Sequence, residues 1–593
     1  MCGIAGYYGK DTRISEGRIQ NCLGLMKNRG PDSDGVFRDD HVLLLASRLA
    51  IVDLSRRANQ PLSSEKAVIV FNGEVYNYRE LQKEFGIDPA CGDAETLFVL
   101  LQREKIRILD RVDGMFAFAY YDRQTYSLSL VRDRFGEKPL HYYEDKTGFY
   151  FGSEPKYIAC LLGRKLEINY DQINRYVLCG YRSLFKGEDT FFKGLLRVKP
   201  GWGLAVKPDQ KILSTYYWRP PKFNPDKNMT FEDAAKETKR LLIRSVERKL
   251  TSDVPVAFSL SGGIDSNSIA GIASSELGKK VTTFSVISDD KRYDESRIVR
   301  KVVDDSQFKW IRVYPSFDNS LNNLRKIIEY HESPLSTITH YVNWQLMKGV
   351  HENGYKVIIG GSGGDELFAG YYDHHLYYLR SLRDDLNFWA AMGDWLKYVK
   401  PLIRNLQLWN VQVGRQHLYY SLLGWILENV RPEAFDEADF CSDELRNRML
   451  NELFYETMPV MLHEDDLNAM QFSVENRTPF LDRKLFEFSL TIPTKLLIRN
   501  GYGKAVLREA MKGIVPGFVL KERRKTGFNI GIQEVFNFDD PAFLYWLFGD
   551  CYLREIMDFD QAKRTIEQRQ FDGETSKFLF GLISAKMFLE IFG

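Results

Sequence analysis

The chain carries two groups of residues, far apart in the sequence, whose types can do chemistry. The first begins at Cys2, which becomes the N-terminal residue if Met1 is removed and then carries a thiol beside a free α-amino group. Such an amine has a pKa of about 7.7 to 8.0, so it can take the thiol proton and return it to a leaving amine without a histidine. A chain that keeps Met1 has no such amine and is expected to be inactive in this chemistry.

Further along the chain, four residues can complete a nucleophilic site with Cys2. Asn72 and the backbone of Gly73, in the segment FNGEVYN, can donate hydrogen bonds to the oxyanion that forms when a thiolate attacks a carbonyl. Arg48 can clamp an α-carboxylate in a bidentate pair, and Asp93 can pair with an α-ammonium group. These groups together predict recognition of a free amino acid.

The second group is SGGIDS at residues 261–266, which follows a strand pattern and precedes a helical one. Its glycines let backbone N–H groups turn toward an anion, and a helix N-terminus adds partial positive charge. Asp265 would repel a phosphate unless a metal ion intervened, so it is a candidate Mg²⁺ ligand. The loop differs from the G-x-x-x-x-G-K-[ST] sequence of γ-phosphoryl transfer. A serine-rich helix cap without a ligand is the alternative at this point.

The elements that must hold these groups differ between the two halves of the chain. About 200 residues at the start read as short strands joined by Gly, Asp and Asn turns, which predicts two packed sheets with few helices. A polar, proline-containing stretch at 207–230 predicts a domain boundary. Beyond it, helical spacing over 231–250 and then alternating strands and helices predict a parallel α/β sheet. Aromatic residues at helical spacing over 371–462 predict a helical addition whose aromatic stripe is core.

Composition limits the classes of partner. The 593 residues include 81 Lys and Arg against 80 Asp and Glu, so no overall charge favours nucleic acid or an anionic membrane. The seven cysteines show neither C-x-x-C spacing nor disulfide density, and no run is apolar enough to span a bilayer. We therefore expect a cytoplasmic enzyme of two or more domains that binds neither nucleic acid nor a membrane.

The ordered motifs MCGI, RGPD and NGEVYN, followed by SGGIDS, GGDELFAGY and KAVLRE, resemble the glutamine-hydrolysing asparagine synthetase family over nearly the whole chain. The resemblance implies an α+β N-terminal-nucleophile (Ntn) hydrolase sandwich, two antiparallel sheets between helices, as a class II glutamine amidotransferase domain over 1–210. It implies an α/β parallel-sheet ATP-pyrophosphatase domain with helical additions over 211–593. The implied substrates are glutamine, ATP and an acceptor carboxylate, with Mg²⁺, and a homodimer is left open.

The resemblance also implies roles for individual residues. Cys2 attacks the side-chain amide of glutamine, Asn72 and Gly73 stabilise the oxyanion, and Lys504 steadies the pyrophosphate and acyl-adenylate. Ammonia passes from Cys2 to the adenylate through a dry passage. Arg477 and Arg508 are either anion partners or structural anchors. The implied binding residues are, for glutamine, Arg48, Asn72, Glu74 and Asp93; for ATP, Leu260, Ser261, Gly262, Gly263, Asp265, Ser266, Val286, Gly361 and Ser362; and for the metal ion, Asp265 and Asp365.

One position departs from the family pattern. Ser362 stands in the stretch GGSGGDE where asparagine synthetases carry a glutamate, and a serine hydroxyl is a poor base. Two enzymatic interpretations stay open: aspartate is the acceptor and the missing carboxylate comes from elsewhere, or the acceptor is another carboxylate, such as a uronic acid of a surface polysaccharide or a natural-product precursor. A degenerate homologue that acts as a scaffold would be expected to have lost Cys2, SGGIDS or Lys504, and all three are present.

Overall fold

The computed structural model describes residues 2–9, 14–181, 184–207, 211–287, 294–403, 406–409, 427, 430, 436–524, 530–569, 571 and 573–593. Met1, whose removal the proposed chemistry needs, lies outside this part of the chain, as do 404–405, 410–426, 428–429 and 431–435 of the aromatic segment.

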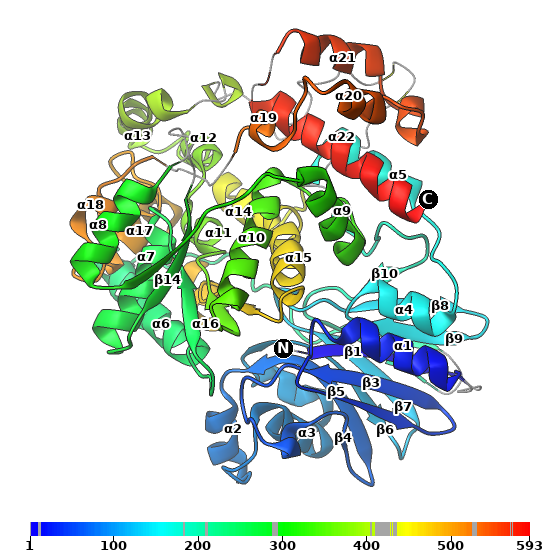
Figure 1. Cartoon of the computed structure of the whole chain (residues 1–593). Coiled ribbons are helices and arrows are strands. Elements are labelled where there is room, and N and C mark those ends of the chain that lie inside the picture. Colours follow the sequence, from blue (N-terminus) through cyan, green and yellow to red (C-terminus); the bar gives the residue numbers. More distant parts are fainter. Residues whose placement is uncertain are drawn as a thin grey trace.

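The first half of the chain forms two antiparallel sheets of six strands each, which confirms the predicted sandwich (Figure 1). Its strands are β1 (Cys2–Tyr8), β2 (Ser33–Arg38), β3 (Val42–Arg48), β4 (Leu62–Ser63), β5 (Ala67–Val75), β6 (Gly114–Asp122), β7 (Ser127–Arg132), β8 (His141–Asp145), β9 (Gly148–Gly152), β10 (Leu196–Arg197), β11 (Trp202–Val206) and β12 (Ile212–Tyr216). One sheet has the order β10-β8-β9-β1-β3-β2 and the other β12-β11-β7-β6-β5-β4.

Alternation along the central strands builds the layers of this half. Ile4 and Leu44 pack against Val70 between the two sheets, whereas Ala5 and Leu45 face the opposite way, under helices. Because both faces are covered, β1, β3 and β5 are buried along their whole length. The helices of this half are α1 (Glu16–Met26), α2 (Tyr78–Phe85), α3 (Asp93–Glu104), α4 (Pro155–Leu162) and α5 (Tyr170–Cys179), with short 3₁₀ turns η1 (Arg56–Ala58) and η2 (Lys105–Asp110). Helices α1 and α4 cover the first sheet, and α3 covers the second.

The second half is built on a parallel five-stranded sheet, as predicted. Its strands are β13 (Val256–Ser259), β14 (Thr282–Val286), β15 (Lys309–Val313), β16 (Val357–Ile359) and β17 (Glu475–Arg477). In the order β15-β14-β13-β16-β17, the chain adds β14 and β15 on one side of β13 and then β16 and β17 on the other, so the strand order reverses at β13 and β16, which pair in parallel. Ligands of open parallel sheets bind in the crevice beyond the carboxyl ends of the strands at such a reversal. The SGGIDS loop follows β13, and the stretch GGSGG follows β16.

Helices surround this sheet, beginning with the helix predicted over 231–250, which is observed as α6 (Phe231–Lys249). The others are α7 (Ile264–Gly271), η4 (Ile272–Glu276), α8 (Ser296–Ser306), α9 (Ser320–His331), α10 (Ile338–Glu352), α11 (Gly364–Phe368), α12 (Tyr372–Ser381), α13 (Phe388–Asp394), η5 (Trp395–Val399), η6 (Lys400–Leu402), η7 (Leu406–Trp409), α14 (Glu444–Phe454), α15 (Thr457–Met470), α16 (Arg483–Ser489), η9 (Thr494–Leu496), α17 (Ala505–Ala510), α18 (Gly517–Leu520), α19 (Ile532–Val535), α20 (Pro541–Leu547), η10 (Tyr552–Glu555), α21 (Phe559–Glu567) and α22 (Gly573–Phe592). Within the described ranges, no helix combines the length and apolarity needed to cross a membrane.

The aromatic segment divides between packing and surface. Tyr377 and Tyr378 are buried in the core around α6, and Leu376 packs against Trp395 in a smaller cluster, as the core interpretation predicts. Tyr371 instead lines the large cavity described below. The segment therefore contributes to both the core and the cavity wall.

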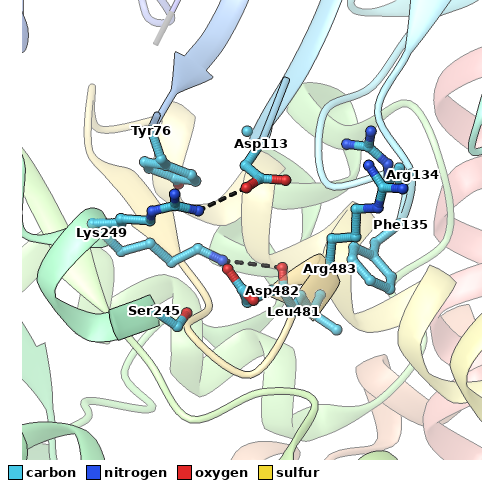
Figure 2. Close-up of a pocket in the computed structure, with 11 residues that line it drawn as sticks. Tyr76, Asp113, Arg134, Phe135, Ser245, Lys249, Leu481, Asp482 and Arg483 are labelled. Carbon is cyan, nitrogen blue, oxygen red and sulfur yellow. Dashed lines mark hydrogen bonds and ion pairs between the residues drawn. The ribbon is translucent and has the colours of Figure 1, made fainter. Parts of the chain in front are cut away.

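The two halves are in contact at several places, among them the two described next and an ion-pair network described below. Helix α22, late in the chain, packs against α5 of the first half and α9 of the second (Figure 1). On the other side, a polar cavity of about 20 Å³, room for one water molecule, lies between Tyr76 after β5 and Lys249 at the end of α6 (Figure 2). Beside it, Arg248 donates to Asp113 at 2.6 Å and Lys249 donates to the carbonyl of Leu481 at 3.1 Å.

Candidate functional site

The first site centres on Cys2, the first residue of β1. Strand pairing places Cys2 opposite Arg48 of β3, and Asn72 approaches from β5 in the other sheet. The backbone nitrogen of Cys2 donates a hydrogen bond to Asn72 Oδ1 at 3.1 Å. Residues 70 positions apart are thus brought into contact. The thiol is buried, and burial raises its pKa above the usual value.

Asn72 has an unused donor. Its side chain is completely buried, and while Oδ1 accepts from Cys2, Nδ2 has no hydrogen-bond partner among the described residues. Gly73 follows with φ +148°, and a Cβ there would lie 2.1 Å from the carbonyl oxygen of Met115 on β6. A buried N–H without an acceptor costs about 1–3 kcal/mol, so this donor is available to a negative oxygen that forms beside Cys2.

Gln60 is a neighbour of the thiol that the sequence analysis missed. Its Nε2 lies 3.6 Å from Cys2 Sγ and donates to the carbonyl of Phe71 at 2.9 Å. Its Oε1 accepts from the Phe71 nitrogen at 2.6 Å. The side chain is therefore fixed against β5, one residue before Asn72. A glutamine in a polar loop has no sequence signature that would have identified it.

The predicted glutamine-binding residues differ in the hydrogen bonds that they already make within the protein. The Arg48 guanidinium donates to the carbonyls of Ser55, Val52 and Asp53 and to Asn59 Oδ1, so it holds the loop after β3. These contacts involve both terminal nitrogens of the guanidinium, Nη1 and Nη2. The sequence predicts a ligand carboxylate as the partner of Arg48, whereas in the structure the guanidinium binds this loop.

Asp93 and Glu74 are two buried carboxylic acids. Asp93 is the first residue of α3 and accepts from the Val75 nitrogen at 2.9 Å, and burial raises the pKa of Asp93 to about 6. Burial, then the charges of Glu475 and Asp93, raise the pKa of Glu74 well above its usual value. The Arg477 guanidinium lies 3.8 Å from Glu74. A ligand ammonium group would offset this excess of buried carboxylates.

The second site begins at the SGGIDS loop. The Ser261 nitrogen donates to Ser266 Oγ at 3.1 Å, and Asn267 Nδ2 donates to the carbonyls of Ser261 and Gly263 at 2.9 and 2.6 Å. Glu295 accepts from the Gly262 nitrogen at 3.0 Å. The loop is therefore held by the side chains of Ser266 and Asn267 at the start of α7 and by the carboxylate of Glu295.

Lys504 joins this loop to the loop after β16. Its Nζ lies 2.5 Å from Asp265 Oδ2 and 2.7 Å from Asp365 Oδ1. Burial lowers the pKa of Lys504, but the two carboxylates outweigh it and the net shift is upward, so the ammonium stays charged. The two predicted metal-binding carboxylates therefore converge on one cationic position.

A single cavity of about 1,070 Å³ collects the residues of the second site. All nine predicted ATP-binding residues line it, together with Asp365 and Lys504. Its walls continue onto α5, α10, α15 and α22. The volume is at the upper limit of about 300–1,000 Å³ that is typical of small-molecule pockets. The cavity can therefore hold more than a nucleotide.

The two arginines that the sequence left undecided are held by protein groups. Arg477 binds Glu475 at 2.6 Å and the carbonyl of Lys249 at 2.6 Å. Arg508 donates to the carbonyls of Gly503 and Leu520 at 2.9 and 2.8 Å. Their guanidinium groups therefore hold neighbouring protein groups, and both residues also border the cavity.

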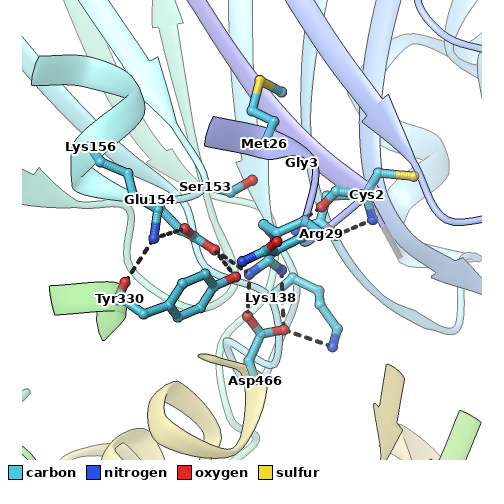
Figure 3. Close-up of polar contacts among 12 residues, drawn as sticks. Cys2, Gly3, Met26, Arg29, Lys138, Ser153, Glu154, Lys156, Tyr330 and Asp466 are labelled. Carbon is cyan, nitrogen blue, oxygen red and sulfur yellow. Dashed lines mark hydrogen bonds and ion pairs between the residues drawn. The ribbon is translucent and has the colours of Figure 1, made fainter. Parts of the chain in front are cut away.

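A buried ion-pair network connects the first site to helix α15 of the second half (Figure 3). Arg29, in the RGPD motif, is fully buried and donates through Nε to the carbonyl oxygen of Cys2 at 3.1 Å. Its Nη1 lies 3.0 Å from Glu154 and 2.8 Å from Asp466 on α15, and Lys138 also reaches Asp466, at 3.2 Å. Cys2 of the first half is thus tied to a helix of the second. The motif was noticed in the sequence, but this role of its arginine was not.

Comparison with known proteins agrees with both halves. A family model described as asparagine synthase matches residues 237–548, and one described as a glutamine amidotransferase domain matches residues 1–218. Glutamine-hydrolysing asparagine synthetase 1 of Bacillus subtilis is 30% identical over 90% of this chain and 87% of its own length. A putative asparagine synthetase of Methanocaldococcus jannaschii is 28% identical over 79% of this chain and 92% of its own. Amidase chry2 of Gibberella zeae is 28% identical over 88% of each chain.

Proposed function

Since the chain belongs to the glutamine-hydrolysing asparagine synthetase family, we propose that it activates an acceptor carboxylate with ATP and amidates it with ammonia from glutamine. One observation carries this proposal. Arg29 binds the carbonyl of Cys2 and, through Asp466, the helix α15 that forms part of the wall of the Lys504 cavity. The two proposed reactive centres therefore belong to parts of one molecule that are in direct contact, which supports transfer of ammonia between them.

The glutaminase step uses Cys2 after removal of Met1. The α-amino group, at the position of the nitrogen that donates to Asn72, takes the thiol proton, and the thiolate attacks the side-chain amide carbon of glutamine. Asn72 Nδ2 and the Gly73 N–H stabilise the oxyanion. Asp93 binds the α-ammonium group of glutamine, with Glu74 beside it, and Arg48 orders the loop that faces its carboxylate. Collapse of the intermediate returns the proton to nitrogen and releases ammonia, and water then hydrolyses the thioester to glutamate.

The adenylation step uses the SGGIDS loop and Lys504. An oxygen of the acceptor carboxylate attacks the α-phosphorus of ATP, and the bond from that phosphorus to the bridging oxygen of pyrophosphate breaks. The N-terminal end of α7, with its partial positive charge, and the Lys504 ammonium offset the charge of the departing pyrophosphate. The products are an acyl-adenylate and pyrophosphate.

The carboxylates of Asp265 and Asp365 fit a magnesium ion. Both reach the same cation, Lys504 Nζ, within 2.7 Å, and carboxylate oxygens are the ligands that Mg²⁺ prefers. These two residues would hold the ion, which when bound supplies charge neutralisation at the phosphate oxygens.

We propose aspartate as the default acceptor and retain one alternative. Ser362 lines the cavity where the family pattern has a glutamate, and a relative at 28% identity is named an amidase instead of a synthetase of asparagine. These two observations favour an acceptor other than aspartate, such as a uronic acid or a natural-product precursor.

The test measures pyrophosphate release from Mg-ATP and glutamine with and without L-aspartate, with mass detection of asparagine and verified removal of Met1. Asparagine equal to the pyrophosphate formed would establish aspartate as the acceptor. Glutaminase activity without aspartate-dependent pyrophosphate would direct the search to other carboxylates. Absence of both activities would refute the enzymatic proposal and favour a scaffold. Cys2→Ala is the matched control, since it should lose only the glutamine-dependent reaction and keep that with added ammonia.

A further inference from the structure

The proposed reaction leaves a proton that the protein must remove. Ammonia attacks the carbonyl carbon of the acyl-adenylate, the C–O bond to AMP breaks, and the products are an amide, AMP and one proton. The new C–N bond first carries an NH₃⁺ group, and ammonia is expelled again unless a base takes a proton from it. Ser362, in the loop after β16, has no charge and is a poor base, so the base must lie elsewhere in the cavity.

Most acidic groups that face the cavity already bind a cationic side chain or a backbone N–H group of the protein. Asp265 and Asp365 bind Lys504, and Glu295 holds the Gly262 N–H of the phosphate loop. Glu452 binds Arg448 at 3.0 Å. The remaining paired or weakly basic groups on the wall are Asp373 beside Arg448, Glu522 beside Arg524, and His340 and His375, whose pKa values burial lowers to about 4 and 3.

Asp465 differs from these groups. It lies on the face of α15 that lines the cavity, and its side chain is 16% exposed there. It accepts one hydrogen bond, from Asn343 Nδ2 at 2.7 Å, and lies 3.8 Å from His340 Nδ1. No lysine or arginine in the described part of the chain pairs with it, and His340 Nδ1 is itself buried without a hydrogen-bond partner there.

The neighbours of Asp465 on α15 point to the direction from which ammonia arrives. Asp466, the next residue, turns away from the cavity and binds Arg29, which holds the carbonyl of Cys2. Two consecutive residues of α15 therefore face the two sites: Asp466 binds the network at Cys2, and Asp465 lines the cavity. Asp465 is the acidic group of the cavity wall that lies next to this connection.

Building on the proposed function, we propose that Asp465 is the general base of the amidation step, taking a proton from the nitrogen of the tetrahedral intermediate as AMP departs. The carboxylate becomes a carboxylic acid in this step and returns the proton to solvent after the amide leaves. Asn343 orients the carboxylate, and His340 on α10 borders the same space.

The electrostatic surroundings suit this role. Burial raises the pKa of Asp465 to about 7, the hydrogen bond from Asn343 opposes the rise, and the charge of Asp466 adds to it. A base with a pKa near the working pH is present in its active form and still accepts a proton readily. The other groups facing it are Asn343 and His340 of α10 and its helix neighbours Glu464 and Asp466.

The experiment compares Asp465→Asn with wild type, using the carboxylate found to support pyrophosphate release, L-aspartate by default. We expect glutaminase activity and the first-turnover burst of pyrophosphate to stay within about threefold, while amide formation falls by about 10²–10⁴-fold, the usual contribution of a general base. Hydroxylamine, a less basic nucleophile whose adduct loses its proton more easily, should restore product. Asp465→Glu should recover part of the amidation rate, with a shifted pH profile.

Glu464→Gln is the matched control, because Glu464 is the adjacent acid on α15, is bound to Ser336 and is not on the cavity wall; its side chain is 3% exposed against 16% for Asp465. It should leave the ratio of amide to pyrophosphate unchanged. Amide formation by Asp465→Asn at the wild-type rate would overturn the inference alone. Equal loss of the pyrophosphate burst would also overturn it, because Asp465 would then serve adenylation or folding. Wild-type protein that releases no pyrophosphate would instead refute the proposed function.

Discussion

Replacing Asn72 with leucine tests its proposed role as oxyanion donor, because the expected effect on stability is small and the expected effect on catalysis is large. The side chain is completely buried, and its Nδ2 has no partner within the described residues while Oδ1 accepts from Cys2. Leucine has a similar volume and removes the unpaired donor, whose burial costs about 1–3 kcal/mol, but it also leaves the buried Cys2 nitrogen without its acceptor, at a cost of about the same size. Because the two costs are of similar size and opposite sign, we expect stability to stay within about 2 kcal/mol of wild type.

Catalysis by the same variant should respond very differently. Removal of one oxyanion donor typically reduces kcat by about 10²–10³-fold, which corresponds to about 2.7–4 kcal/mol of transition-state stabilisation. Glutamate release from glutamine should fall by this factor with little change in KM, and urea unfolding should report the stability. Amide formation with added ammonia is the internal control and should be unaffected. A glutaminase kcat within threefold of wild type would refute the assignment of Asn72 Nδ2 to the oxyanion.

Three further results are expected. Burial raises the pKa of Asp93 to about 6, and its ionised form binds the ligand ammonium. Protonation of the Cys2 amine already lowers kcat/KM for glutamine below about pH 7.7 to 8.0, so Asp93 should steepen the fall by a further tenfold per pH unit below about pH 6, and Asp93→Asn should lack only this steeper limb. Lys504→Met should reduce pyrophosphate release by at least about 10²-fold while glutamine hydrolysis continues, and an unchanged rate would remove Lys504 from the mechanism. Arg29→Met leaves Asp466 buried without its main partner and should destabilise the protein by about 3–5 kcal/mol in urea unfolding, whereas an unchanged midpoint would show that the ion pair contributes little.

The sequence predicted those parts of the sites that lie in short contiguous motifs. Asn72 and Gly73 adjoin on one strand, and SGGIDS forms one turn, so local chemistry alone indicated their use. The alternation of strands and helices predicted the parallel sheet, and therefore the edge at which this loop lies. Both sheets of the first half were also predicted, because their apolar strands are separated by turn residues.

Contacts between distant residues could not be read in the same way. Arg29 and Asp466 are 437 positions apart, and nothing in a charged residue of either segment specifies the other as its partner. Asp465 and Asp466 are adjacent acids, yet burial raises the pKa of one to about 7, while Arg29 and Lys138 lower that of the other despite its burial. A helix turns about 100° per residue, so only the packed structure decides which acid meets the arginine and which meets the cavity.

The packing of α22 against α5 has a consequence for synthesis of the protein. Tyr176 and Val177 of α5 share a hydrophobic core with Leu579 and Phe580 of α22, although about 400 residues separate the two helices. At about 5–20 residues per second, a ribosome makes α22 some 20–80 s after α5. During that interval the apolar face of α5 lacks its cover. Nascent chains should therefore expose a chaperone-binding surface that disappears only when α22 emerges, and truncation before Gly573 should leave the first half prone to aggregation.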